Sequence, residues 1–207
     1  RYQFMITARN LKKKFDTFTA LDDVSFEFED GEIFGIIGHN GAGKTTLLKI
    51  ISGLIAPTHG ELYINDIDVV KNPVLLKENL GYLPEESRLY ETMTAENYLA
   101  FFGEIYGLSA QEIRVRSAQL FAALSLEPDG KKIGEFSKGM KRKAAIARSL
   151  IHDPKFLVYD EATSGLDPMT SRFIADYLRR PRLDGKTIVL SAHNLYQVEA
   201  ICDKVMI

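Results

Sequence analysis

Three short runs of apolar residues, each bounded by turn-forming or polar residues, predict buried strands. They cover residues 33–37, 156–159 and 187–190. Between these runs, apolar side chains recur at helical spacing, as in residues 44–52, where Gly53 follows as a candidate helix end. Buried strands that alternate with helices are typical of a largely parallel sheet covered on both faces.

The N-terminal and middle parts of the chain have different patterns. Apolar and polar residues alternate in 24–29 and similarly in 60–64, which predicts half-exposed antiparallel strands. Strand signals then vanish between Pro84 and about Asp153, and apolar residues follow a helical period. Three helices are predicted there, over residues 94–106, 110–124 and 138–151.

These patterns together predict one α/β domain over residues 1–207. Residues 1–84 and 154–207 form its core, which has an antiparallel β-subdomain in its N-terminal part. Residues 85–153 form a helical subdomain inserted into that core.

Composition narrows the class of protein. The 207 residues are 45% apolar and 26% charged, which suits a folded domain of this size. The net charge of −2 argues against a protein held to nucleic acid by bulk charge. The single cysteine, Cys202, excludes a disulfide within the chain. No apolar run approaches the roughly 20 residues that span a bilayer, so we expect a soluble chain, with any membrane-spanning part in a separate partner.

A glycine-rich loop follows the first predicted strand. Residues 38–45 read GHNGAGKT and fit the pattern G-x-x-x-x-G-K-[ST]. The glycines allow successive backbone N–H groups to face one anion, and the helix that follows adds its positive end. Lys44 would place its charge between the β- and γ-phosphates, and the Thr45 hydroxyl would bind Mg²⁺. The residues predicted to surround the phosphates are Gly38, His39, Asn40, Gly41, Ala42, Gly43, Lys44, Thr45 and Thr46.

Two carboxylates follow the second predicted strand. Asp160 and Glu161 lie where ligands bind in parallel α/β sheets, beyond the carboxyl end of a buried strand. Asp160 suits a Mg²⁺ ligand acting through a water, and Glu161 suits the general base that orients and polarises the attacking water. The alternative is a helix-capping or surface acidic pair, which the phosphate loop upstream disfavours.

Over nearly its whole length the chain resembles the nucleotide-binding domain of ATP-binding-cassette proteins. The family's motifs occur here in the family's order, and that ordered set is specific to the family. After the phosphate loop they are GYLPE at 81–85 in place of the glutamine loop, FSKGM at 136–140 in place of the L-S-G-G-Q signature, Asp160-Glu161, SGLD at 164–167, and His193.

The resemblance implies a P-loop ATPase of RecA-like fold and assigns further roles. His193 would contact the γ-phosphate, and Phe15 would stack on adenine, although an aromatic residue at that position is also unremarkable. Ser137 and Gly139 would contact the γ-phosphate bound by a second copy, and Ser137 also suits a helix N-cap. Asp167 would lie near the junction of the two copies. ATP and Mg²⁺ are the implied ligands, with Lys44, Glu161 and His193 as the catalytic residues.

Two departures from the family pattern affect the site. Glu85 replaces the usual glutamine, which keeps an oxygen ligand for Mg²⁺ but adds negative charge beside the phosphates; the neighbouring Glu86 leaves open which carboxylate faces the metal. Lys138 and Met140 replace glycine and glutamine of the signature, and the Lys138 charge would partly offset Glu85. Both departures resemble the drug, sodium and polysaccharide exporter branch.

The resemblance therefore implies the motor subunit of a transporter, working with a transmembrane permease and a second nucleotide-binding domain in a homodimer or heterodimer. Such a subunit is cytoplasmic and peripheral on the inner face of the cell membrane. The alternatives are a soluble relative acting on ribosomes or chromosomes, and an unrelated P-loop kinase or GTPase, against which the signature and His193 argue. Family members usually continue beyond residue 207.

Overall fold

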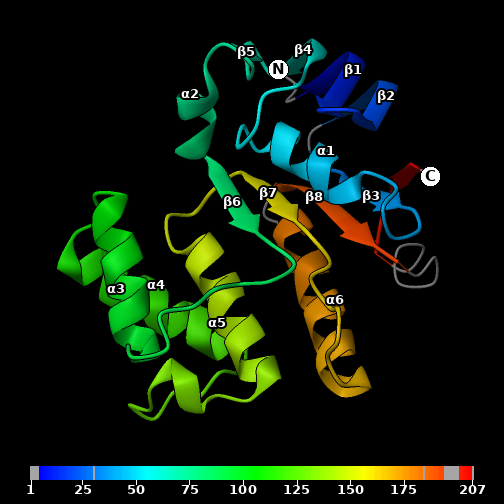
Figure 1. The fold of residues 1–207 in the computed structure, drawn as a ribbon. Coiled ribbons are helices and arrows are strands. Elements are labelled where there is room, and N and C mark those ends of the chain that lie inside the picture. Colours follow the sequence, from blue (N-terminus) through cyan, green and yellow to red (C-terminus); the bar gives the residue numbers. More distant parts are fainter. Residues whose placement is uncertain (1–4, 30, 184, 194–200, 207) are drawn as a thin grey trace.

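The computed structural model describes residues 5–29, 31–183, 185–193 and 201–206. Its strands form two sheets (Figure 1). The first sheet is antiparallel, as its alternating polar and apolar sequence predicts, and has the order β2-β1-β4-β5. Its strands are β1 (Met5–Phe15), β2 (Phe18–Glu29), β4 (His59–Ile64) and β5 (Ile67–Asp68).

The second sheet is parallel and has the order β6-β7-β8-β3-β9. Its strands are β3 (Ile33–Ile37), β6 (Leu80–Leu83), β7 (Phe156–Tyr159), β8 (Thr187–Ala192) and β9 (Lys204–Met206). Because Tyr159 pairs with Leu190 and Ile37 with Ala192, the carboxyl ends of β7, β8 and β3 meet at one edge. The loops that follow these strands are therefore brought together.

Helices cover both faces of the parallel sheet (Figure 1). Helix α1 lies between the two sheets, while α5 and α6 pack on the opposite face and α3 and α4 pack beside α5. The helices are α1 (Lys44–Ile51), α2 (Pro73–Lys77), α3 (Ala95–Ile105), α4 (Ala110–Ala123), α5 (Lys138–Leu150) and α6 (Pro168–Leu183), with a 3₁₀ turn at Ile133–Glu135.

The hydrophobic core lies on both faces of the parallel sheet. Side chains along β7 point alternately to the two faces of the sheet. Phe156 and Val158 pack toward α1 and the antiparallel sheet, and Leu157 and Tyr159 pack toward the helices on the other side. The two sheets are joined by stacked rings: Phe28 of β2 and Phe34 of β3 have centroids 4.5 Å apart. This packing fixes the antiparallel sheet over the start of the phosphate loop's strand.

The structure confirms the α/β class with a mainly parallel sheet, a separate antiparallel sheet and a run of helices between β6 and β7. The predicted strand at 24–29 is the second half of the longer β2. The sequence patterns did not predict the strands β1, β5 and β6 or the short helix α2. In β6, Gly81 weakens the strand signal, and the structure explains this glycine: a Cβ there would lie 2.5 Å from the Ser149 carbonyl of α5.

We predict that Phe28→Ala lowers the free energy of unfolding by about 3–5 kcal/mol, because it removes a fully buried ring from between the two sheets. Urea denaturation followed by circular dichroism measures the loss. Phe18→Ala is the matched control, since the Phe18 side chain is 60% exposed. Equal stability of the two variants would contradict the packing of the Phe28 ring between the two sheets.

Candidate functional site

The phosphate loop joins β3 to α1 through two residues with left-handed backbone angles. Gly41 has φ of 84° and Gly43 has φ of 90°. At Gly43 a side chain is excluded for two reasons: the positive φ disfavours it, and an added Cβ would lie 2.4 Å from the Ala20 carbonyl oxygen of β2. The loop therefore packs its backbone against the antiparallel sheet and leads directly into the N-terminus of α1, as the glycine pattern predicts.

Lys44 is the first residue of α1, and its side chain is buried. The ammonium group donates to the carbonyl oxygens of Gly38, at 2.7 Å, and His39, at 3.1 Å. These two bonds fold the side chain back over the loop and hold its charge at the loop's concave side. A phosphate that binds there can replace the two carbonyl oxygens as the acceptor.

Asp160 and Glu161 follow β7 directly, and both are buried. Ser191 of β8 ties them together, since its hydroxyl donates to Asp160 Oδ1 at 2.5 Å and accepts from the Glu161 N–H at 3.0 Å. Glu161 has φ of 47°, an uncommon angle for a residue with a side chain. Ser191 is not among the site residues predicted from the sequence, although its position at a strand end, two residues before His193, is a usable signal.

Four charged or ionisable groups converge on Glu161. The Lys44 ammonium lies 4.0 Å from Glu161 Oε1, and His193 Nε2 lies 2.5 Å from Oε2. Ligand atoms of Glu85, Glu161 and His193 all lie within 4.8 Å of one another. Burial raises the pKa of the Glu161 carboxyl, and the charges of Glu85 and Asp160 act in the same direction, while His193 and Lys44 oppose them. A carboxyl tuned in this way suits a general base.

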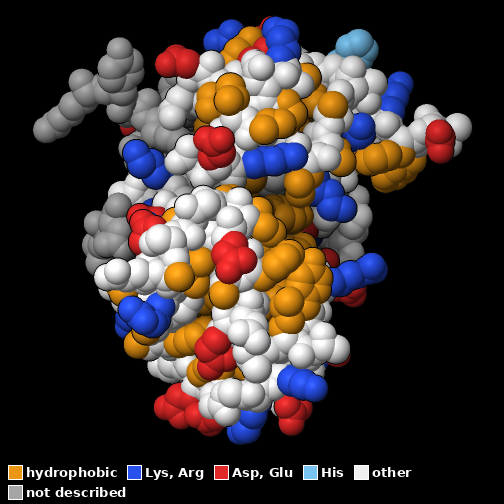
Figure 2. All heavy atoms as spheres, turned by 90° about the vertical axis from the view of Figure 1, so that its left-hand side faces the viewer, with side chains coloured by type: hydrophobic (Ala, Val, Ile, Leu, Met, Phe, Trp, Pro, Cys, Tyr) orange, Lys and Arg blue, Asp and Glu red, His pale blue; other side chains and the backbone are white. Residues whose placement is uncertain are grey.

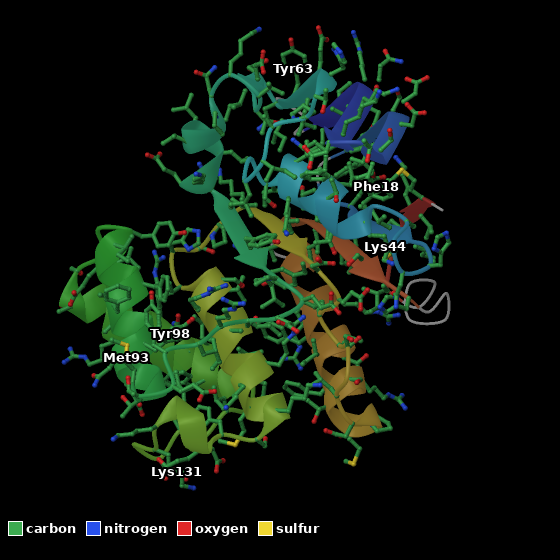
Figure 3. All side chains as sticks on the ribbon, viewed as in Figure 1. Phe18, Lys44, Tyr63, Met93, Tyr98 and Lys131 are labelled. Atoms are coloured by element: carbon green, nitrogen blue, oxygen red, sulfur yellow. The ribbon has the colours of Figure 1, made fainter. Side chains whose placement is uncertain are left out.

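A cavity of about 380 Å³ lies in front of the phosphate loop. Phe18 and Lys44, both labelled in Figure 3, line this cavity. Its lining residues are Phe18, Ala20, Asn40, Gly41, Gly43, Lys44, Thr45, Thr46, Glu85 and Glu161. The structure thus brings together the phosphate loop and Glu161, and it places Glu85 rather than Glu86 on the cavity.

The aromatic residue in the cavity wall is Phe18, whereas Phe15 is the residue predicted to stack on adenine. The two residues pair across the tight turn between β1 and β2, and both side chains are exposed. The Lys13 ammonium covers the Phe15 ring at 5.0 Å from its centroid. Because the sequence alone could not show which side of the hairpin faces the phosphate loop, it gave no reason to prefer Phe18.

The donor atoms at this edge fit a hard divalent cation. Asp160 Oδ2 is buried and has no hydrogen-bond partner among the described residues. Such an unpaired buried carboxylate oxygen is costly unless a ligand satisfies it. Thr45 and Glu85 line the cavity, whereas Asp160 is not among its lining residues. The oxygen donors that Mg²⁺ prefers therefore lie in the cavity wall and at the adjacent end of β7.

The residues of the signature-like segment lie elsewhere. Ser137 is exposed and caps α5, where its hydroxyl accepts from the Met140 N–H at 3.2 Å. Neither Ser137 nor Gly139 lines the cavity. Asp167 accepts from the Thr170 N–H at the start of α6. Hydrogen bonding from the Thr170 side chain, and next from its backbone, lowers the pKa of the Asp167 carboxyl. Lys138 reaches across to Gly165, where an added Cβ would clash with its ammonium group.

Comparison with known proteins gives concordant results. The sequence profile of the ABC transporter family matches residues 21–164. The chain is 39% identical to the ABC transporter ATP-binding protein NatA of Bacillus subtilis, over 98% of this chain and 85% of that protein. It is 35% identical to the Nod factor export ATP-binding protein I of a Rhizobium species, over 98% of this chain and 67% of that protein.

A similar solved structure has the same fold. It is a dimeric, post-hydrolysis state of an ATP-binding cassette bound to ADP and Pi, with 27% sequence identity and a TM-score of 0.86, covering 94% of this chain and 90% of that one. The profile match covers more than half of the chain, and the relatives align over almost all of it. With its glycine loop, strand-end carboxylates and capped signature helix in the family's order, this chain belongs to the ABC transporter family.

Proposed function

We propose that this chain binds ATP with Mg²⁺, hydrolyses it to ADP and phosphate, and thereby drives transport by a separate transmembrane partner. One observation carries the proposal: the buried Lys44 and Glu161 meet in a single cavity formed by the phosphate loop. The family membership and the ATP-binding relatives support it. The related dimeric cassette bound to ADP and Pi supports hydrolysis in a dimer.

The backbone N–H groups of the phosphate loop and the α1 N-terminus would hold the β- and γ-phosphates. Lys44 would exchange its two carbonyl acceptors for phosphate oxygens. Thr45, Asp160 and Glu85 would hold Mg²⁺, which when bound neutralises charge on the phosphate oxygens. The chain's own groups then position the reactants and stabilise charge, which is most of what phosphoryl transfer requires.

Glu161 would act as the general base. Its carboxylate takes a proton from a water molecule whose oxygen attacks the γ-phosphorus, and the bond to the β–γ bridging oxygen breaks to release ADP. His193, in contact with Glu161 Oε2, orients that carboxylate and would reach the γ-phosphate. Burial of Glu161 limits its contact with solvent, and the residue lines the cavity.

A single chain lacks the signature donors in its own cavity, which supports a dimer. We propose that Ser137 and Gly139 at the exposed start of α5 contact the γ-phosphate held by a second copy or a related domain. Asp167 would lie near the junction. ATP then favours a closed pair, and loss of the γ-phosphate favours opening. In this cycle residues 85–153 would move as a helical subdomain against the core formed by residues 1–84 and 154–207.

An exposed aromatic surface supports a membrane partner. None of the helices that the structure describes is long and apolar enough to cross a bilayer. Figure 2 shows hydrophobic side chains gathered on the face that carries α2 and α3. On α3, Tyr98 and Leu99 are buried, but Phe101 and Ile105 are exposed, and Tyr90 packs on Phe101 at 5.8 Å. We propose that a permease docks here, which would place the chain on the cytoplasmic face of the cell membrane. Co-purification with a membrane protein tests this.

We predict that Lys44→Ala weakens ATP binding at least about tenfold, because it removes a charge-assisted contact to the phosphates. Isothermal titration calorimetry measures the dissociation constant. Lys49→Ala is the matched control, since Lys49 is an exposed lysine of the same helix. Unchanged nucleotide binding by the Lys44 variant would refute the assignment.

We predict that Glu161→Gln keeps ATP binding, slows hydrolysis by about 10²–10⁴-fold and accumulates an ATP-bound dimer, because the general base is lost while the contacts remain. Phosphate release and light scattering measure the two effects. Glu86→Gln serves as the control, as Glu86 is exposed and does not line the cavity. If the Glu161 variant hydrolyses ATP at the parental rate, Glu161 is not the base.

We predict that Phe15→Ala raises the dissociation constant for ATP about 5–150-fold, the range for losing one base–aromatic stack, and leaves binding of inorganic tripolyphosphate unchanged. Phe18→Ala, measured in parallel by calorimetry, decides which ring is used. If Phe18→Ala alone weakens ATP binding, adenine stacks on the ring in the cavity wall, and the assignment of Phe15 is wrong.

A further inference from the structure

Arg142 is a buried arginine of α5 that the proposed reaction does not use directly. Its side chain donates hydrogen bonds to six oxygen atoms, five of them backbone carbonyls. Nε donates to Ala162 at 2.8 Å, while Nη2 donates to Asp160 at 3.0 Å and Glu161 at 2.7 Å. One guanidinium therefore holds three consecutive carbonyl groups of the turn after β7.

The other terminal nitrogen holds a second segment. Nη1 donates to the carbonyl oxygens of Pro84 at 2.8 Å and Glu85 at 3.0 Å, and lies 3.3 Å from Ser87 Oγ. The guanidinium thus spans the loop after β6 and the turn after β7. Glu85 and Glu161 both line the cavity, and Arg142 donates to the backbone carbonyl group of each.

The same hydrogen bonds also account for the positive φ of Glu161. Three successive carbonyl groups can face one guanidinium only if the chain curls tightly, and Glu161 has φ of 47° at that curl. Burial lowers the pKa of the Arg142 guanidinium to about 10, so the group stays charged at neutral pH. Its planar fork of five N–H donors fits this arrangement, whereas a lysine ammonium offers three donors from one point.

Arg142 also lies close to the signature-like end of its helix. Ser137 caps α5 five residues earlier, which is about 7.5 Å along a helix at 1.5 Å per residue. A displacement of the α5 N-terminus would therefore be carried by a short, rigid helical segment to the backbone of Glu85 and Glu161.

We infer that Arg142 is a positioning residue that sets the spacing between Glu85 and Glu161 and couples it to the signature end of α5 in the same chain. This inference rests on the proposed function. When the nucleotide bound by a second copy contacts Ser137 and Gly139, it holds α5 in place. Through Arg142, α5 then holds the loop that carries Glu85 and the turn that carries Glu161. Each chain's catalytic carboxylates are thereby aligned when its signature end is occupied.

The test is Arg142→Lys, which keeps the charge but cannot reproduce the fork, with Arg142→Gln as a second variant. In the full chain we expect kcat for ATP hydrolysis to fall at least about tenfold, since small displacements of a general base cost this much or more. The dissociation constant for a non-hydrolysable ATP analogue should stay within about threefold, because the phosphate loop is untouched. The Hill coefficient for ATP should fall toward 1.

Arg148→Lys is the matched control. Arg148 lies on the same helix, and among the described residues it donates to one backbone carbonyl, that of Tyr82, at 2.9 Å. It contacts neither the loop after β6 nor the turn after β7 in any hydrogen bond of the described residues, so kcat should stay near the parental value. Thermal melts of all variants separate loss of folding from loss of positioning.

Parental kcat in both folded Arg142 variants overturns the inference. So does a fall in kcat that is matched by an equal loss of analogue binding, since that is general damage to the site. Failure of both variants to fold assigns Arg142 to stability alone and also overturns it. If the parental chain does not hydrolyse ATP at all, the proposed function fails instead, so the two failures are distinguishable.

Discussion

The parallel pairing of β3, β7 and β8 is the constraint on which the rest of the structure depends. Pairing in this register places the phosphate loop after β3, the carboxylates after β7 and His193 after β8 at one edge of the sheet. Residues separated by more than a hundred positions in the chain thereby meet around Glu161. Because both faces of the sheet are covered, the edge is the place where strand-end polar groups can meet a ligand.

Bringing these charges to a covered edge is costly, and the surrounding residues offset much of that cost. Lys44 is buried, but its ammonium group donates hydrogen bonds to two loop carbonyl groups. Ser191 satisfies one oxygen of Asp160 and the amide of Glu161. Part of the cost is not offset: the buried Oδ2 of Asp160 has no hydrogen-bond partner among the described residues, and the pKa of the Glu161 carboxyl is raised. Such residual imbalance is common where a ligand supplies the missing partner.

Helix α5 contributes to the site by holding backbone carbonyl groups of the loops that carry Glu85 and Glu161. Helix α5 has a capped, exposed N-terminus at Ser137, and five residues later it carries the buried Arg142, which contacts the loops that bear Glu85 and Glu161. The same helix also packs closely on β6, where Gly81 leaves room for its backbone. A contact at one end of α5 can therefore affect the cavity without crossing the sheet.

The sequence by itself determined the chemistry of the phosphate loop, the strands that end at it and the order of the motifs, because each of these depends on local patterns. Local sequence patterns are enough to identify buried strands such as 156–159 and the glycines at 41 and 43 that permit positive φ. Only the tertiary structure decided that Phe18 lies in the cavity wall, that β6 is a strand despite Gly81, and that Arg142 joins two loops. These features depend on which distant segments pack together, and no local periodicity encodes such contacts.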